Sequence, residues 1–228
     1  EAVADVFSGN MQIEAEAAAS GQSLASTLNC FLKTELMTGE FDLTAQMASS
    51  GKPQDLLDRL QGNFTITAAD GRIYKFSLLA DILAVVNITE ILKGQAPDLA
   101  GEGFKYKTAE ARGVVEKGIL RLTEGNIKGN SMDIAFSGEL NAPEKQMDMI
   151  VLVTPLQTVD SIIESIPIIG DILGENFIAV PVRVTGDLSD PAVIPISPSA
   201  VGKGVLGIVE RTLKLPVKIV QPFLPEEK

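Results

Sequence analysis

Apolar and polar residues alternate along much of the chain, and this alternation predicts a β-sheet with one dry and one wet face. The first example lies near the N-terminus, where Met11, Ile13 and Ala15 alternate with Gln12 and Glu14. Successive side chains of a strand point to opposite faces, so such a segment has one apolar and one polar side. The pattern predicts about ten strands, at residues 7–19, 31–37, 41–49, 63–69, 72–76, 104–116, 119–123, 131–140, 146–153 and 177–188.

The connections between the predicted strands are short and polar. Residues 38–40, 70–71, 126–130 and 141–144 contain glycine, asparagine, aspartate or proline, which favour turns. Short turns join strands that run in opposite directions, so the pattern predicts an antiparallel meander. Glycine and apolar residues also recur 30 positions apart within residues 9–51, a spacing typical of stacked β-units.

Three apolar segments predict helices, at residues 77–93, 161–173 and 199–213. The first is the longest, and its isoleucine, leucine and valine residues cover nearly the whole circumference. Such a helix must be buried on most sides, so it is either a plug over the apolar face of the sheet or the lid of a groove that holds a lipid. Pro167 and Gly170 interrupt the second segment, which is also shorter than the roughly 20 apolar residues of a membrane span.

These elements predict the α+β class. We expect a strongly bent, mainly antiparallel β-sheet, shaped as a groove or half-barrel, with apolar helices packed at its dry face. A chain of 228 residues is long enough to bury a substantial core. We expect a single domain over residues 1–215 and an extended, proline-rich tail over residues 216–228.

The composition favours an aliphatic core and argues against several partners. Hydrophobic residues make up 45% of the chain, but aromatic residues only 5%. The formal net charge of −11 disfavours nucleic acids and anionic lipid surfaces, because phosphate groups need a basic surface. This charge does not bear on the acyl chains of lipids. The chain begins at Glu1 without an initiator methionine or a signal peptide, which predicts an excised or processed piece of a longer protein.

Candidate catalytic chemistry is sparse. The chain has no histidine and one cysteine, Cys30, which excludes histidine-based triads, histidine metal ligands and an internal disulfide. Carboxylate pairs such as Asp55 and Asp58 fall on predicted polar faces and fit no metal-ligand spacing. The glycines of residues 202–207 lack the spacing of a phosphate loop. We therefore predict a protein that is not an enzyme and that has no cofactor and no bound metal.

The candidate functional residues are apolar residues of the dry face and of the longest helix. Acyl chains need only apolar area, worth about 25 cal/mol per Å², and no directional contacts. We predict a lipid-binding groove lined by Phe64, Ile66, Leu79, Leu83, Ile91, Ile134, Phe136, Met149, Val151, Val180 and Val182. For each residue taken singly, an ordinary place in the core is an equally good interpretation.

Several motifs of this chain resemble the C-terminal region of the AsmA-like family of Gram-negative envelope proteins, the TamB/AsmA type of bridge-like lipid transport proteins. In that family a leucine-rich segment precedes L-x-G-x-F-x-I, and later come P-x-x-G-x-x-L and a strand that closes on V-x-G-x-x-x-x-P. The matching residues are Leu60, Gly62, Phe64 and Ile66, then Pro167, Gly170 and Leu173, then Val184, Gly186 and Pro191. The resemblance covers roughly residues 39–213.

The resemblance implies the C-terminal part of a periplasmic, inner-membrane-anchored protein. Such a protein binds and conducts phospholipid acyl chains along a hydrophobic β-groove between the inner and outer membranes, and its anchor helix is absent from this chain. No catalytic residue comes with the resemblance. The alternative is a non-catalytic scaffold or assembly module for outer-membrane protein biogenesis that offers a sheet edge to an envelope protein partner. A hydrolase of envelope lipids is disfavoured, because the chain lacks a nucleophile motif.

Overall fold

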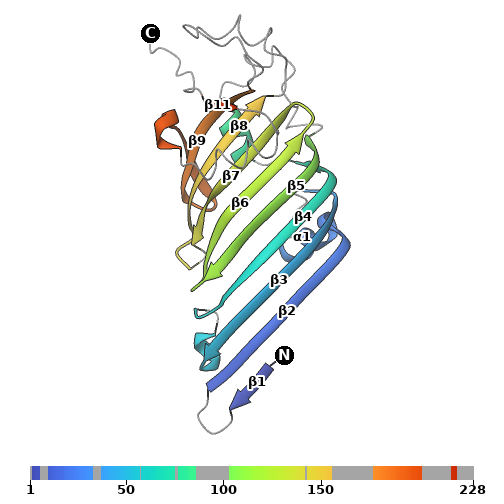
Figure 1. Ribbon diagram of the computed structural model, residues 1–228, viewed down its shortest axis with the longest axis vertical. Helices are drawn as coiled ribbons and strands as arrows, with labels where there is room; N and C mark the ends of the chain where they lie inside the picture. Colours follow the sequence, from blue (N-terminus) through green and yellow to red (C-terminus); the bar gives the residue numbers. More distant parts are fainter. Residues whose placement is uncertain are drawn as a thin grey trace, which may run out of the picture.

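One antiparallel sheet contains most of the residues that the computed structural model describes, namely 2–5, 10–32, 37–56, 58–74, 77–85, 103–141, 143–155, 177–201 and 217–219. Ten strands follow one another across the sheet in chain order (Figure 1). They are β1 (Ala2–Asp5), β2 (Asn10–Ser23), β3 (Glu40–Gly51), β4 (Gln61–Ile73), β5 (Phe104–Glu116), β6 (Ile119–Gly129), β7 (Met132–Asn141), β8 (Gln146–Pro155), β9 (Phe177–Asp187) and β10 (Asp190–Pro195). A short strand, β11 (Val217–Ile219), pairs in parallel with the start of β9.

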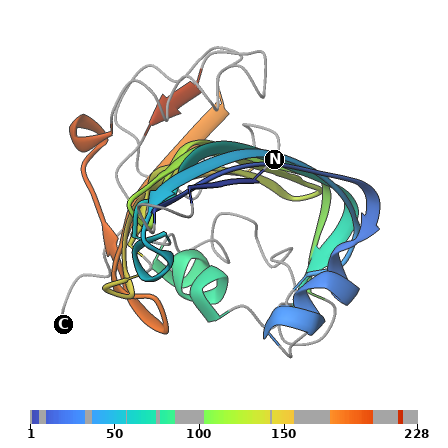
Figure 2. The same ribbon diagram turned by 90° about the horizontal axis from the view of Figure 1, so that it is seen from below.

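The sheet is curved and open. Figure 2 shows it as an arch, with the helix α2 (Ser77–Val85) on the concave side and the helix α1 (Leu24–Leu32) beside β2 at one rim. Within the described residues β1 and β10 do not pair with each other, so the sheet does not close into a barrel. The expected antiparallel sheet is confirmed. Helix contributes less than the predicted α+β class implies, since the described helices are these two and the 3₁₀ turns Pro53–Asp55 and Pro198–Ala200.

The strand registers bring the dry residues of neighbouring strands into rows. In one row Leu43 pairs with Ile66, which pairs with Ala111 on its other side. Further along the same row Val151 lies between Phe136 and Val182. Because directly paired residues of an antiparallel sheet point to the same face, each row adds to one continuous apolar surface.

Three strand boundaries differ from the sequence prediction. The strand predicted at residues 31–37 is wrong at its start, because α1 occupies Leu24–Leu32 and buries Leu24 in the core. Residues 33–36 lie outside the described residues, and Met37 forms an isolated antiparallel bridge with Ile73. The turn predicted at residues 70–71 is wrong as well, since β4 continues through it with Asp70 at a φ of 49°. The turn predicted at residues 126–130 is shorter and lies later, because β6 runs on to Gly129 and β7 begins at Met132.

The end of the sheet also contains an element that the alternation pattern missed. The last predicted strand ends at residue 188, yet β10 pairs with β9 from Asp190 to Pro195. This strand lies at the edge of the sheet, where a residue without an N–H is tolerated. The predicted helix at residue 77 begins there as α2. The parts of the helix predictions at residues 86–93, 161–173 and 202–213 lie outside the described residues.

Candidate apolar binding face

The two faces of the sheet differ in chemistry. Buried residues of α2, including Leu79 and Leu83, belong to the same apolar cluster as the dry residues of the strands, so the dry face is the concave face (Figure 2). The convex face carries ion pairs between neighbouring strands. The Arg183 guanidinium binds both carboxylate oxygens of Asp148, at 2.7 and 2.5 Å. This pairing lowers the pKa of the Asp148 carboxyl.

On the concave face, large side chains lie over glycines of the next strand. A Cβ added to Gly113 would come within 2.9 Å of Cε1 of Phe64, and one added to Gly125 would collide with the ring of Phe136. Side chains crowd together on the inside of a curved sheet, and a glycine gives the neighbouring aromatic ring its space. The sequence thus allows the sheet to curve towards its apolar side.

Burial of the concave face increases from the N-terminal to the C-terminal strands. On β7, β8 and β9 the dry residues are enclosed: Ile134 is 4% exposed, Val151 5% and Val182 0%. On β2 the corresponding residues Ala15 and Ala17 are exposed. The region β7–β9 is therefore a packed core, whereas the dry face of β2 is open to solvent.

We define the open dry face as Ala15, Ala17, Ala45, Met47, Phe64 and Ile66. These residues come from β2, β3 and β4 and are exposed or half-buried. The registers place Ala15 beside Met47, and Ala17 beside Ala45, which in turn pairs with Phe64. All six side chains are apolar, so this surface offers area without a hydrogen-bonding group.

Ten of the eleven residues predicted to line a groove belong to the apolar core cluster of the concave face or pack against it. Seven are buried: Leu79, Leu83, Ile134, Met149, Val151, Val180 and Val182. Phe64, Ile66 and Phe136 are half-buried and pack against the others. Ile91 lies outside the described residues. The prediction missed Ala15, Ala17, Ala45 and Met47, although their alternation with polar residues in β2 and β3 was a usable signal.

Two polar residues are buried on the convex side, at the start of β7 and at the end of β8. Asp133 is 8% exposed, and burial raises the pKa of its carboxyl from 3.8 to about 6. A hydrogen bond from the Gly129 N–H and the charges of Lys128 and Lys107 act in the opposite direction. The residue opposite Asp133 on β8 is Thr154, which is 0% exposed and whose hydroxyl has no hydrogen-bond partner among the described residues.

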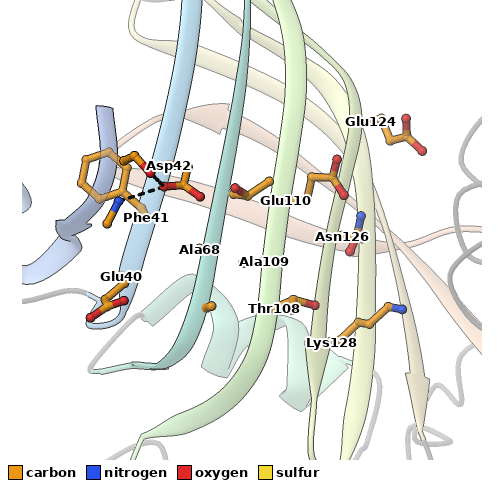
Figure 3. A pocket seen from close by; sticks show the side chains of 14 residues that line it. Glu40, Phe41, Asp42, Ala68, Thr108, Ala109, Glu110, Glu124, Asn126 and Lys128 are labelled. Atoms are coloured by element: carbon orange, nitrogen blue, oxygen red, sulfur yellow. Dashed lines mark hydrogen bonds between the residues drawn. The ribbon is translucent and has the colours of Figure 1, made fainter. Parts of the chain in front are cut away.

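A hollow of about 670 Å³ lies on the convex face (Figure 3). Asp42 accepts hydrogen bonds from the Ser20 hydroxyl at 2.7 Å and the Gly21 N–H at 2.8 Å, which lower the pKa of its carboxyl. Glu110 and Glu124 lie further along the wall, where both pair with Arg112. Within the described residues no cluster of carboxylate, thiol or imidazole groups could hold a metal ion.

The fold defines a class: an open, one-sided antiparallel sheet whose concave face is apolar and partly exposed. Among the described residues no helix has the length and hydrophobicity to cross a membrane. The chain belongs to the YhdP family, since the family model described as YhdP protein matches residues 6–193. This family is part of the AsmA/YhdP-type group of envelope proteins. The resemblance to AsmA-like proteins is thus supported at the level of the group.

Searches of curated proteins and of solved structures found no match for this chain.

Proposed function

We propose that the open dry face binds the acyl chains of phospholipids. The chain would act, without catalysing a reaction, as the C-terminal part of a periplasmic, inner-membrane-anchored protein that conducts phospholipid between the two membranes. The observation that carries the proposal is the open dry face itself, exposed on β2 and half-buried on β3 and β4, which leads without a polar interruption into the core. Membership of an envelope protein family supports it.

An acyl chain suits this surface better than a polar ligand does. Burying one methylene group contributes about 0.8 kcal/mol and requires no directional contact. Ala15 and Ala17 are small, so they leave room above β2, while Met47 and Phe64 stand higher on the neighbouring strands. A chain of methylene groups that lies along β2 would therefore contact apolar side chains on its β3 side.

The burial gradient limits where the ligand would lie. Val182 is 0% exposed and Val151 5%, so a lipid could reach them only if the core opened. Core opening costs packing energy, because protein interiors are as densely packed as organic crystals. Of the residues predicted from sequence, Phe64 and Ile66 remain suitable for contact with lipid, and the alanines of β2 are added to them.

The experiment compares two adjacent exposed alanines of β2. Ala17 lies on the dry face and Ala18 on the wet face. In the Ala17→Asp variant the hydrated carboxylate would keep two or three methylene groups from being buried, a loss of about 2 kcal/mol or roughly 30-fold in affinity. Ala18→Asp is the matched control, with the same charge on the opposite face.

Co-purified phospholipid is measured by native mass spectrometry and by lipid extraction. We expect wild type and Ala18→Asp to retain phospholipid, and Ala17→Asp to lose most of it with unchanged circular dichroism and melting temperature. Absence of lipid from the wild-type protein, or equal retention by both variants, would contradict the proposal. Val182→Asp is unsuitable for this purpose, because a buried carboxylate would unfold the core.

A further inference from the structure

The hollow on the convex face is lined by a buried side-chain amide, that of Asn126. This residue is 9% exposed, so more than nine-tenths of it is buried. Within the described residues its amide has no hydrogen-bond partner, so the amide oxygen and nitrogen are open to a ligand in the hollow. Buried polar side chains of folded proteins are nearly always hydrogen-bonded, so an unpaired amide at the wall of a hollow indicates a binding site.

The strand registers set a row of polar side chains across the hollow. It runs from Asp42 on β3 through Thr67 on β4 and Glu110 on β5 to Asn126 on β6. Neighbouring strands lie about 4.8 Å apart, so the carboxylates of Asp42 and Glu110, two strands apart, are separated by about 10 Å. Figure 3 shows Asn126 beside Glu110 on the wall of the hollow.

The centre of the hollow is low because the side chains between the two carboxylates are short. Thr67 separates Asp42 from Glu110, and two residues further along β4 Ala69 pairs with Thr108 in the next row. These short side chains leave a volume of about 670 Å³ open above the sheet. A chain of methylene groups suits such a floor, because it needs contact area but no hydrogen bond.

The walls of the hollow carry more negative than positive charge. Its described lining residues include one lysine, Lys128, and four carboxylates, those of Glu40, Asp42, Glu110 and Glu124. Arg112 pairs with Glu110 and Glu124, which leaves an excess of two negative charges. The hollow therefore favours a ligand with positive charge.

The Asp42 carboxylate keeps one oxygen open. The Ser20 hydroxyl and the Gly21 N–H both donate to Oδ1, so Oδ2 can accept from a ligand. One metal ion cannot use carboxylates that are about 10 Å apart, because even Ca²⁺ takes its ligands at about 2.3–2.6 Å. Two positive charges joined by an apolar linker match this spacing instead.

We propose that the hollow binds a linear aliphatic diamine or polyamine, with one ammonium group at Asp42 and a second between Glu110 and Asn126. The ammonium groups donate hydrogen bonds to both carboxylates and to the Asn126 amide oxygen, and the methylene chain crosses β4 over Thr67. Charge-assisted hydrogen bonds of this kind are about twice as strong as neutral ones. The site lies on the convex face, so the proposal does not depend on lipid binding at the open dry face.

A single ammonium group fits the hollow less well. A lysine side chain of a protein partner, for example, carries one positive charge and neutralises half of the excess. It can reach Asp42 or Glu110, but not both, because they lie about two strand spacings apart. The number and spacing of amino groups in the ligand therefore provide the test.

The probe is diaminoheptane with an amino group at each end, a chain long enough to span the two carboxylates. Heptylamine has the same chain with one amino group, and diaminopropane has two amino groups on a chain too short to span them. Binding to the 228-residue protein is followed by NMR, through the side-chain amide of Asn126 and the backbone amide of Thr67. We expect diaminoheptane to shift both signals and to bind about tenfold more tightly than either control, the effect of one hydrogen bond to a charged group.

Two variants and a matched control test the geometry. Asp42→Asn keeps the oxygen that accepts from Ser20 and Gly21 but removes the charge, and we expect diaminoheptane to bind it no more tightly than heptylamine does. Asn126→Ala should weaken diaminoheptane binding about tenfold, followed through Thr67. Asp190→Asn makes the same change in charge at an exposed site on β10, and it should retain the tenfold preference.

The proposal is overturned if no amine shifts the signals of Asn126 and Thr67, or if heptylamine or diaminopropane binds as tightly as diaminoheptane. Equal binding of heptylamine would indicate a site for a single ammonium group, such as a lysine of a partner. It is also overturned if Asp42→Asn keeps the preference for diaminoheptane, or if Asp190→Asn loses it to the same extent. Circular dichroism of each variant verifies that the sheet is intact.

Discussion

Asp133 provides the sharpest test of the electrostatics of this fold. Its carboxyl lies on the convex side of β7, opposite Thr154 of β8 and Lys128 of β6. Burial raises its pKa to about 6, whereas the unfolded chain keeps the usual 3.8. The replacement Asp133→Asn removes the charge but retains an oxygen that can accept the hydrogen bond from the Gly129 N–H.

The direction of the effect follows from proton linkage. Between pH 4 and 6 the folded protein holds a proton on Asp133 that the unfolded chain has released, so this group stabilises the fold below pH 4 and the stabilisation is lost as the pH rises to 6. A shift of about two pKa units corresponds to about 3 kcal/mol, and partial solvent screening reduces the expected value to about 1–3 kcal/mol. The pKa of about 6 already reflects the charges of Lys128 and Lys107, which lower it.

The measurement is urea unfolding of wild type and Asp133→Asn from pH 4 to pH 8. We expect equal stability at pH 4 and a variant more stable by about 1–3 kcal/mol at pH 8. Asp42, Asp148 and Asp187 have lowered pKa values, so their contributions change mainly below pH 4 and do not mask the effect. A variant that is less stable at pH 8, or a difference that does not depend on pH, would refute the reasoning.

Two packing predictions concern the concave face. The Tyr106 hydroxyl donates to the Thr38 carbonyl at 2.6 Å and its side chain is fully buried, so Tyr106→Phe should cost about 1–2 kcal/mol of unfolding free energy; an unchanged denaturation midpoint would contradict this. Gly125→Ala should cost about 1–3 kcal/mol because the new methyl group collides with the Phe136 ring, and adding Phe136→Leu should recover part of that loss. Additive losses in the double variant would show that the two side chains do not meet.

The sequence by itself determined which residues share a face. Alternation in β2, β3, β7, β8 and β9 identified the dry side correctly, because the twofold repeat of a strand is set by the backbone of each segment alone. It also identified an antiparallel arrangement through the short turn predicted at residues 141–144, which the structure has at residues 143–145. The sequence-based prediction failed where pairing with a neighbouring strand overrode a local turn preference. At Asp70, a turn-forming residue pair continues as strand because β5 pairs with β4 on both sides of it.

Only the tertiary structure decided which part of the dry face is core and which part is open. Val182 and Ala17 both lie on the dry face of the sheet, yet Val182 is fully buried whereas Ala17 is exposed. The burial of Asp133 was likewise absent from the pattern. Burial depends on contacts between residues far apart in the chain, such as the bond from Tyr106 to Thr38 across 68 positions, and alternation within one strand carries no information about them.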